Sequence, residues 1–309
     1  MSVLCNRVES GENWTIYNGD CCEVVKAFPD DSIHFSVFSP PFSSLYVYSD
    51  SERDMGNCET DQEFWDHFGH LTPELMRVLK PGRLMAVHCM LLPALKSKDG
   101  FIGMKDFRGD VIRHFQSHGF HYHSEICIWK DPVVAMQRTK SIRLLNKQLL
   151  KDSSMSGQSL PDYVCVFRKP GDNQEPITGP IPEYIGPLDE RLKIRTSIDI
   201  WQRYASPVWM DIDQGNVIKN YREGRAEDDE RHLCPLQLDV IERCLQLWSN
   251  PGDIVFSPFT GIGSEGYGSL ELGRKFVGSE LKPEYFDIAV QNLRTAESHG
   301  KQKTLFTAD

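Results

Sequence analysis

The residues best suited to chemistry begin with the tetrapeptide Ser39-Pro40-Pro41-Phe42, which follows an apolar run. The run, residues 33–38, predicts a buried strand, and the prolines end it because proline has no N–H for a strand ladder. The hydroxyl of Ser39 and the carbonyl of Pro40 can accept hydrogen bonds from an exocyclic amine, and the ring of Phe42 can stack on a planar base. Because open α/β sheets bind ligands at the carboxyl ends of their strands, the tetrapeptide is a candidate catalytic site. The alternative is an ordinary strand-to-loop turn.

A second group of candidate residues lies near the end of the chain, in the loop Phe259-Thr260-Gly261-Ile262-Gly263-Ser264. This loop joins a predicted strand at 253–257 to a predicted helix that ends at 272. Glycines there let the backbone approach a ligand, and a helix N-terminus favours a carboxylate or phosphate. Glu280 ends the next predicted strand, where a carboxylate can accept both hydroxyls of a ribose. The pattern predicts a cofactor site, with an ordinary turn and a surface glutamate as the alternative.

Strands and helices alternate around both groups, which predicts an α/β fold. Apolar residues at helical spacing indicate helices, and short apolar runs indicate strands. The predicted strands are 14–20, 33–38, 84–90, 120–129, 163–167, 253–257 and 275–279, and the predicted helices are 61–79, 106–118, 238–248, 264–272 and 283–296.

Two segments depart from this alternation. Residues 133–160 form a basic, loop-like stretch with the candidate phosphate contacts Arg138, Lys140, Arg143 and Lys147. The chain as a whole carries a net charge of −10, so a nucleic-acid partner requires a locally basic segment of this kind. Residues 170–232 are rich in proline, glycine and charge, with interleaved aromatic residues, which favours an insertion on the main sheet.

Composition limits the class of protein. A hydrophobic content of 40% and a charged content of 25% are ordinary for a globular chain of 309 residues. No apolar run reaches the roughly 20 residues of a membrane span, so no membrane partner is expected. Nine scattered cysteines without a Cys-x-x-Cys pair favour reduced thiols in a cytoplasm and argue against a metal site, although His121 and His123 share a strand face.

Taken in order, these motifs resemble those of the amino-methylating DNA methyltransferases, in the permuted β class where the catalytic motif precedes the cofactor loop. The matching stretches include Lys80-Pro81-Gly82, the strand end at Asp20, and His232 before the helix 238–248. Two positions depart from the family pattern. Ser257 stands where an acidic residue is usual, and Leu233-Cys234-Pro235-Leu236 stands where Pro-Thr-Gln-Lys is usual.

The resemblance implies a Rossmann-like methyltransferase sheet with helices on both faces and S-adenosyl-L-methionine as cofactor, converted to S-adenosyl-L-homocysteine. It assigns catalysis to residues 39–42, cofactor binding to the loop 259–264 with Asp20, His232 and Glu280, and DNA binding to the basic segment. It also implies a catalytic half at 1–169, an inserted target-recognition region at 170–231 and a cofactor-binding half at 232–309. The expected partner is double-stranded DNA, bound by a monomer or homodimer in a prokaryotic or phage-encoded restriction-modification setting.

Several alternatives stay open at this point. Family members with serine before Pro-Pro usually act on cytosine N4, so cytosine is favoured over adenine N6. A more distant alternative is a catalytically inactive relative that still binds nucleic acid, and another is a methyltransferase for a protein or small molecule. The presence of both Ser39 and Glu280 argues against an inactive relative, and the basic segment and the large insertion fit a long polyanion better than a protein or small-molecule substrate.

Overall fold

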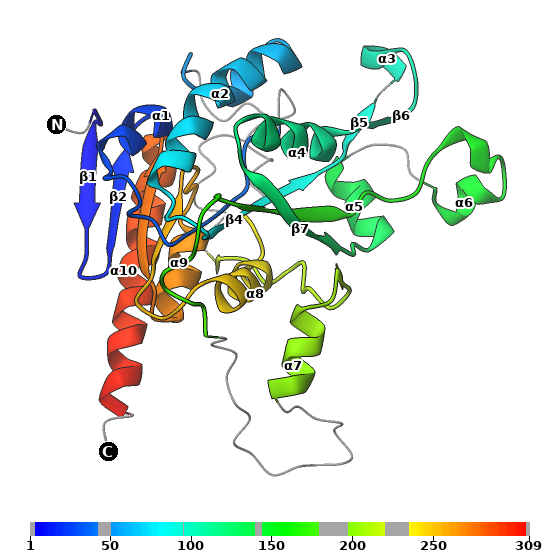
Figure 1. Cartoon of the computed structure of the whole chain (residues 1–309). Coiled ribbons are helices and arrows are strands. Elements are labelled where there is room, and N and C mark those ends of the chain that lie inside the picture. Colours follow the sequence, from blue (N-terminus) through cyan, green and yellow to red (C-terminus); the bar gives the residue numbers. More distant parts are fainter. Residues whose placement is uncertain are drawn as a thin grey trace, which may run out of the picture.

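A nine-stranded sheet forms the centre of the molecule, with the strand order β1-β2-β11-β10-β3-β4-β8-β7-β9 (Figure 1). The computed structural model describes residues 4–42, 51–94, 96–139, 144–178, 197–219 and 235–306. The strands of this sheet are β1 (Arg7–Ser10), β2 (Trp14–Asn18), β3 (Phe35–Phe38), β4 (Leu84–Met90), β7 (His121–Ile128), β8 (Asp162–Arg168), β9 (Val208–Trp209), β10 (Ile254–Ser257) and β11 (Lys275–Glu280).

The five strands β2, β11, β10, β3 and β4 run parallel to one another. Strand β8 runs antiparallel between β4 and β7, so the amino end of β8 lies beside the carboxyl ends of its neighbours. One edge of the sheet therefore holds the residues that follow β2, β3 and β10, those that end β4 and β11, and those that begin β8. Within the described ranges, this edge carries the predicted catalytic residues and the predicted cofactor loop with Asp20 and Glu280.

Helices cover both faces of the sheet, as expected from the sequence (Figure 1). One face packs against α8 (Leu238–Trp248), α9 (Ser264–Glu271) and α10 (Pro283–Phe306), and the other packs against α1 (Cys21–Val24), α2 (Asp61–Val78) and α4 (Phe107–Ser117). Alternate residues of a strand point to opposite faces. Phe35 and Val37 accordingly enter the first core, while Phe38 enters the second.

Sequence patterns explain where the main helices begin and end. Thr60 caps α2 by accepting a hydrogen bond from the N–H of Glu63, and Glu63 accepts one from the N–H of Glu59, which satisfies two donors at the helix start. Gly119, with a φ of +91°, follows α4 in a left-handed conformation that favours glycine. The helices predicted at 61–79, 106–118 and 238–248 are confirmed to within two residues.

The structure also corrects several expectations. The segment 133–160, expected to be loop-like, contains α5 (Pro132–Thr139) and α6 (Asn146–Leu149). A small hairpin of β5 (Leu92–Ala94) and β6 (Gly103–Lys105) flanks α3 (Lys96–Asp99) and was not expected. Helix α10 continues beyond residue 296, where the prediction ended it.

The described part of the predicted insertion is joined to the main sheet. After α7 (Ser197–Tyr204), strand β9 pairs in parallel with β7 at the sheet edge, and Trp209 is fully buried in the first core. The division of the chain at residues 169 and 231 stays a prediction. Among the helices of the described ranges, none is both long and apolar enough to cross a bilayer.

Candidate active site

A pocket at the carboxyl edge of the sheet unites the two predicted groups of residues. It encloses about 1110 Å³ of space, including the part open to solvent. The tetrapeptide after β3 lines one side, and the loop after β10 lines another together with Glu280 at the end of β11. The predicted site residues in its wall are Asp20, Ser39, Pro40, Pro41, Phe42, Phe259, Thr260, Gly261, Ser264 and Glu280.

Glu280 is held by backbone donors within this wall. Its carboxylate accepts hydrogen bonds from the N–H of Gly261 at 2.7 Å and from the N–H of Lys282 at 2.9 Å, one to each oxygen. Burial raises the pKa of Glu280 to about 7, although these two N–H groups lower it. A carboxylate oxygen can accept more than one hydrogen bond, so each oxygen retains capacity for a ligand hydroxyl.

The glycine loop brings the backbone close to the pocket and to helix α10. Gly261 has a φ of +54°, and a Cβ at this position would meet no atom within 4 Å, so the space beside it is open. Gly263 is not part of the wall. It has a φ of +93°, and a Cβ there would lie 3.2 Å from the Cα of Ala289. Gly263 therefore fixes the turn, and Gly261 leaves room for a ligand.

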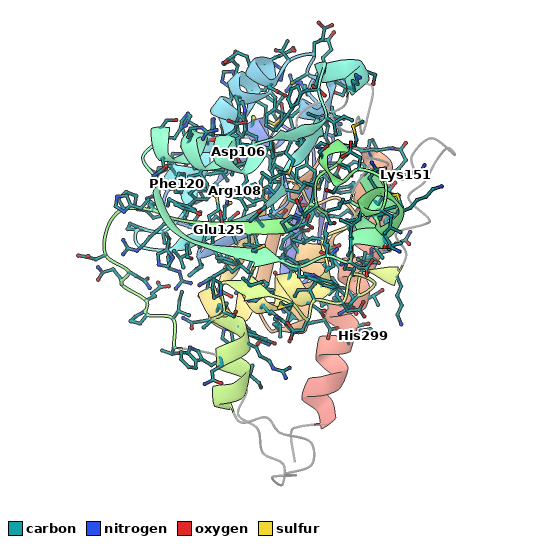
Figure 2. All side chains as sticks on the ribbon, turned by 90° about the vertical axis from the view of Figure 1, so that its right-hand side faces the viewer. Asp106, Arg108, Phe120, Glu125, Lys151 and His299 are labelled. Carbon is teal, nitrogen blue, oxygen red and sulfur yellow. The ribbon has the colours of Figure 1, made fainter. Side chains whose placement is uncertain are left out.

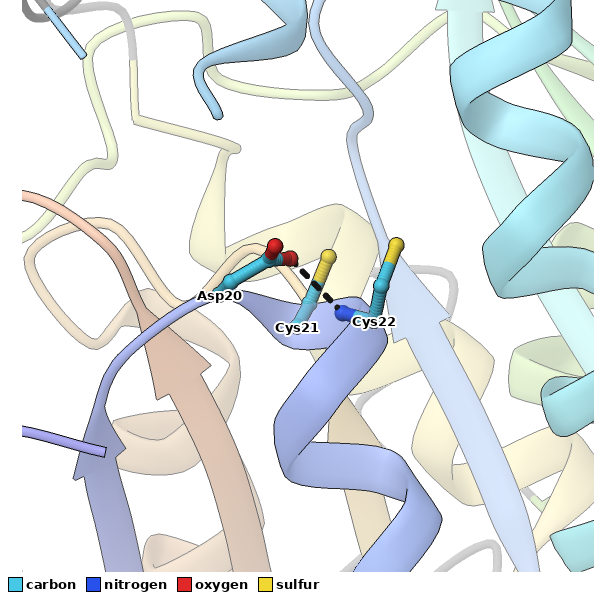
Figure 3. A group of neighbouring side chains, drawn as sticks. All are labelled: Asp20, Cys21 and Cys22. Carbon is cyan, nitrogen blue, oxygen red and sulfur yellow. Dashed lines mark hydrogen bonds between the residues drawn. The ribbon is translucent and has the colours of Figure 1, made fainter. Parts of the chain in front are cut away.

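Asp20, which caps α1, lines the pocket just after β2, the strand that pairs with β11. Its Oδ1 accepts a hydrogen bond from the N–H of Cys22 at 2.9 Å, drawn in Figure 3, and its Oδ2 lies 3.1 Å from Arg53 Nη1. Asp20, Cys21 and Cys22 lie close enough together to ligate a metal. The pKa of Cys21 is well above its usual value because of its hydrogen bond to Cys22 and its burial, which disfavours the thiolate that a metal requires.

Ser39 and Phe42 are half-buried and face this pocket. Ser39 Oγ lies 3.1 Å from Nδ1 of His88, a residue of β4. The ring of Phe42 packs edge-on against Phe107, with ring centroids 5.9 Å apart, and lies 6.3 Å from the His88 ring. These contacts fix the positions of the serine hydroxyl and the aromatic ring at the pocket lip.

Sequence reasoning missed several residues of the site. Glu265, in the first turn of α9, lines the pocket while only 4% exposed, and burial raises its pKa to about 8, with Glu280 adding to the rise. A charged residue directly after the glycine loop was a visible signal for it. His88 was also visible, as the one histidine in the apolar run of β4. Arg53, Asp54, Lys282 and Tyr285 also line the pocket and were not predicted.

The predicted DNA-binding residues lie largely beyond what the structure describes. Lys140 and Arg143 fall outside the described ranges, and for Arg138 only its backbone in α5 is described. His232, predicted to bind the cofactor, also falls outside these ranges. Lys147 is exposed on α6, in an arm that projects from the sheet (Figure 1). Figure 2 shows Lys151 on the same arm, away from Arg108 and Glu125.

The comparisons with known proteins agree with this arrangement. A family model described as DNA methylase, covering enzymes of the N6 and N4 type, matches residues 33–291. The chain belongs to the N6/N4 DNA methylase family. The type II methyltransferase M.Cfr9I of Citrobacter freundii is 23% identical, over 92% of this chain and 89% of that relative. M.BglII of Bacillus subtilis is also 23% identical, over 90% of this chain and 68% of that relative.

Solved structures of DNA methylases share the fold. TTHA0409 of Thermus thermophilus, in complex with S-adenosyl-L-methionine, superposes with a TM-score of 0.65 at 21% identity, over 92% of this chain and 96% of that one. The cytosine-N4-specific PvuII DNA methyltransferase superposes with a TM-score of 0.62 at 17% identity, over 94% of this chain and 93% of that one. This methylase is therefore an S-adenosyl-L-methionine-dependent DNA methyltransferase, and the predicted fold class is confirmed.

The pocket residues fit this cofactor. Glu280 keeps acceptor capacity for ribose hydroxyls, the open space beside Gly261 leaves room for the ligand, and the carboxyl groups of Glu265, Asp20 and Glu280 suit a molecule that carries a sulfonium and an ammonium. Apolar side chains, including Phe259 and Ile262, complete the wall and suit a flat ring such as adenine.

Proposed function

We propose that this methylase acts on the N4 amine of a cytosine flipped out of double-stranded DNA. The observation that carries the proposal is a single pocket lined both by Ser39-Pro40-Pro41-Phe42 and by the loop around Gly261 with Glu280. A methyl donor held by the second group would lie beside an amine held by the first, and such positioning supplies a large share of the rate enhancement in two-substrate reactions.

The cofactor residues act by binding and orientation. Glu280 would accept the ribose hydroxyls, while Asp20, which lines the same pocket, stands at the strand end that the resemblance assigns to the adenine. S-adenosyl-L-methionine supplies a methyl group on a sulfonium, which is activated for transfer without further chemistry by the protein. The resemblance also assigns His232 to this half of the site, and its contribution stays a prediction.

The residues after β3 act on the amine. An aromatic exocyclic amine is a poor nucleophile because its lone pair is delocalised into the ring. Hydrogen bonds from its two N–H groups to Ser39 Oγ and to the Pro40 carbonyl would favour a more tetrahedral nitrogen, and these bonds strengthen as positive charge develops. The ring of Phe42, held by Phe107, would stack on the flipped base.

Ser39 favours cytosine over adenine. The amine of adenine has lower electron density to offer, so a stronger acceptor such as a carboxylate or amide would help it more, whereas a neutral hydroxyl suffices for cytosine. The alternative, adenine N6 methylation, uses the same pocket because both amines present two hydrogens. Digesting methylated DNA to nucleosides and identifying the product by mass spectrometry tests the choice. N4-methylcytidine is expected, and N6-methyladenosine alone would refute it.

We further propose that the basic segment 133–160 contacts DNA phosphates without reading bases. The exposed Lys147 on the projecting arm supports this placement. Neutralising Arg138, Lys140, Arg143 and Lys147 together should weaken binding to all DNA sequences. The slope of log K against the logarithm of the salt concentration should become less steep by about 0.9 per lost contact. Lys275→Gln, at the opposite edge of the sheet, is the control. An unchanged salt dependence with an altered sequence preference would mean that the segment reads bases instead.

Proposals on the setting follow from the same observations. The cysteines of the described ranges are all free thiols, which supports a reducing compartment such as a prokaryotic cytoplasm. The type II relatives support a restriction-modification role. Analytical ultracentrifugation with and without DNA would distinguish a monomer from a homodimer.

A further inference from the structure

We propose that His88, Asp162 and Lys130 form a hydrogen-bonded relay behind Ser39, which orients the serine hydroxyl and receives the proton that the amine loses. This inference rests on the proposed role of Ser39. Ser39 Oγ lies 3.1 Å from His88 Nδ1, and His88 Nε2 lies 3.0 Å from Asp162 Oδ2. The ammonium of Lys130 is paired with the same carboxylate oxygen. The four residues form a continuous chain that begins at the pocket.

The strand register brings these residues together at the carboxyl edge of the sheet. Phe38 of β3 pairs with Val87 of β4, so the next residues along, Ser39 and His88, are neighbours. Strand β8 begins at Asp162, which pairs with Met90 of β4 and with Ile128 of β7. The direct partner of Asp162 on β4 is Met90, and His88 precedes Met90 by two residues. Asp162 therefore lies diagonally across from His88.

Lys130 completes the chain from the other side. It follows Ile128 by two residues, directly after β7 ends, and its side chain is only 12% exposed. The Asp162 side chain is 3% exposed, so both charges of this ion pair are largely removed from water. A buried ion pair costs desolvation free energy, and a protein needs good geometry and additional hydrogen bonds to offset that cost. The His88 contact is such an additional bond.

The charges determine which way the hydrogen bonds run. Burial alone would raise the pKa of Asp162, but Lys130 and His88 outweigh burial and lower it to about 2. The carboxylate is therefore ionised and can only accept, so His88 donates from Nε2. In the neutral imidazole, Nδ1 then has no proton and accepts the O–H of Ser39. The lone pairs of Ser39 Oγ consequently face the pocket, which is the orientation that an acceptor for the amine requires.

The same chain provides a route for the released proton. The nitrogen lone pair forms the new N–C bond, and the sulfur keeps the electrons of the broken S–C bond, so the nitrogen becomes positively charged. Its excess proton passes to Ser39 Oγ while the Ser39 hydroxyl proton passes to His88 Nδ1, and the electrons of the broken N–H bond stay on the nitrogen. The imidazolium that results is stabilised by Asp162 and later loses its proton to water. His88 is thus a positioning residue that acts through Ser39.

A purely structural His–Asp pair would behave differently, and single-turnover methylation of DNA separates the two cases. His88→Ala should lower the methyl-transfer rate by about 10²-fold, while calorimetry finds S-adenosyl-L-methionine affinity within twofold of the wild type. Added imidazole should restore part of the rate. His121→Ala, an exposed histidine on β7, is the control and should leave both quantities unchanged.

A double-mutant cycle supplies the decisive readout. In a Ser39→Ala background, His88→Ala should cause little further loss, because its effect passes through the missing hydroxyl. If His88→Ala folds poorly, Asp162→Asn tests the same relay. The amide of the new asparagine can donate to His88 Nε2, which leaves the imidazole proton on Nδ1. Methyl transfer should then slow although the cofactor still binds. Independent, multiplicative losses, or a His88→Ala rate within twofold of the wild type, would overturn the relay. A wild-type enzyme that methylates neither cytosine nor adenine amines would instead refute the proposed function.

Discussion

Replacing Glu265 with glutamine should stabilise the cofactor-free protein, and increasingly so as the pH rises. The carboxyl group lies in the pocket wall and is 4% exposed, and its pKa is about 8 compared with a usual value of 4.5. A carboxyl group whose pKa is raised on folding contributes stability that is present below pH 4.5 and is lost as the pH rises to about 8. Glutamine has nearly the same shape and does not ionise, so the variant should not undergo this loss.

The size of the effect follows from the shift. One pKa unit corresponds to about 1.36 kcal/mol, so a rise from 4.5 to about 8 corresponds to at most about 5 kcal/mol. Water in the open pocket solvates the carboxylate and reduces this figure. At about 2 °C per kcal/mol for a chain of this length, the variant should melt about 4–10 °C above the wild type at pH 9.

Thermal unfolding followed by circular dichroism between pH 4.5 and 9 measures this difference. The gap between Glu265→Gln and the wild type should widen up to about pH 8 and then level off. Glu284→Gln, at the exposed start of α10, is the matched control and should show no such trend. A constant gap across this range, or a variant less stable than the wild type at pH 9, would refute the account of Glu265.

Three further outcomes are expected. Glu280→Gln should weaken S-adenosyl-L-methionine binding about tenfold in calorimetry, because charge-assisted hydrogen bonds are lost. The variant should also lack the rise in affinity that ionisation of Glu280 near pH 7 gives the wild type. Equal affinities of variant and wild type at pH 8 would remove Glu280 from the site. Gly263→Ala should lower both the melting temperature and cofactor affinity, because its φ of +93° and its approach to Ala289 leave no strain-free place for a Cβ; an unchanged affinity would count against a rigid loop. Arg83→Ala should destabilise the fold by about 3–5 kcal/mol in urea unfolding, since Arg83 is fully buried and pairs with Asp253; a loss below about 1 kcal/mol would contradict this assignment.

Much of this fold was predictable because its strands and helices have strong local patterns. Residues 84–90 form β4 with the predicted bounds. All seven residues are buried, and such a near-continuous apolar run is typical of a strand covered on both faces. The hairpin of β5 and β6 was missed because its strands are three residues long and one contains a proline. The helices within 133–160 were missed because the basic composition of that segment indicates a solvated loop.

The site was predictable where its residues are close in sequence to strand ends. Glu280 and the Gly261 loop end or follow neighbouring parallel strands, and the structure joins them by a hydrogen bond of 2.7 Å. Asp162 and Lys130 were not predictable, because their meeting with His88 depends on β8 lying antiparallel between β4 and β7. Local patterns determine which segments are strands, but strand order arises from long-range packing.

The position of β10 and β11 has a consequence for how the chain folds during its synthesis. These two strands come last in the sequence, yet they insert between β2 and β3 at the centre of the sheet. A nascent chain that has not yet reached residue 254 leaves the facing edges of β2 and β3 unpaired, including the buried run Phe35–Phe38. We expect the ribosome-bound chain to engage chaperones at these edges, and the cofactor pocket to form only when the last strands arrive. The methylase would therefore gain its activity in one late step.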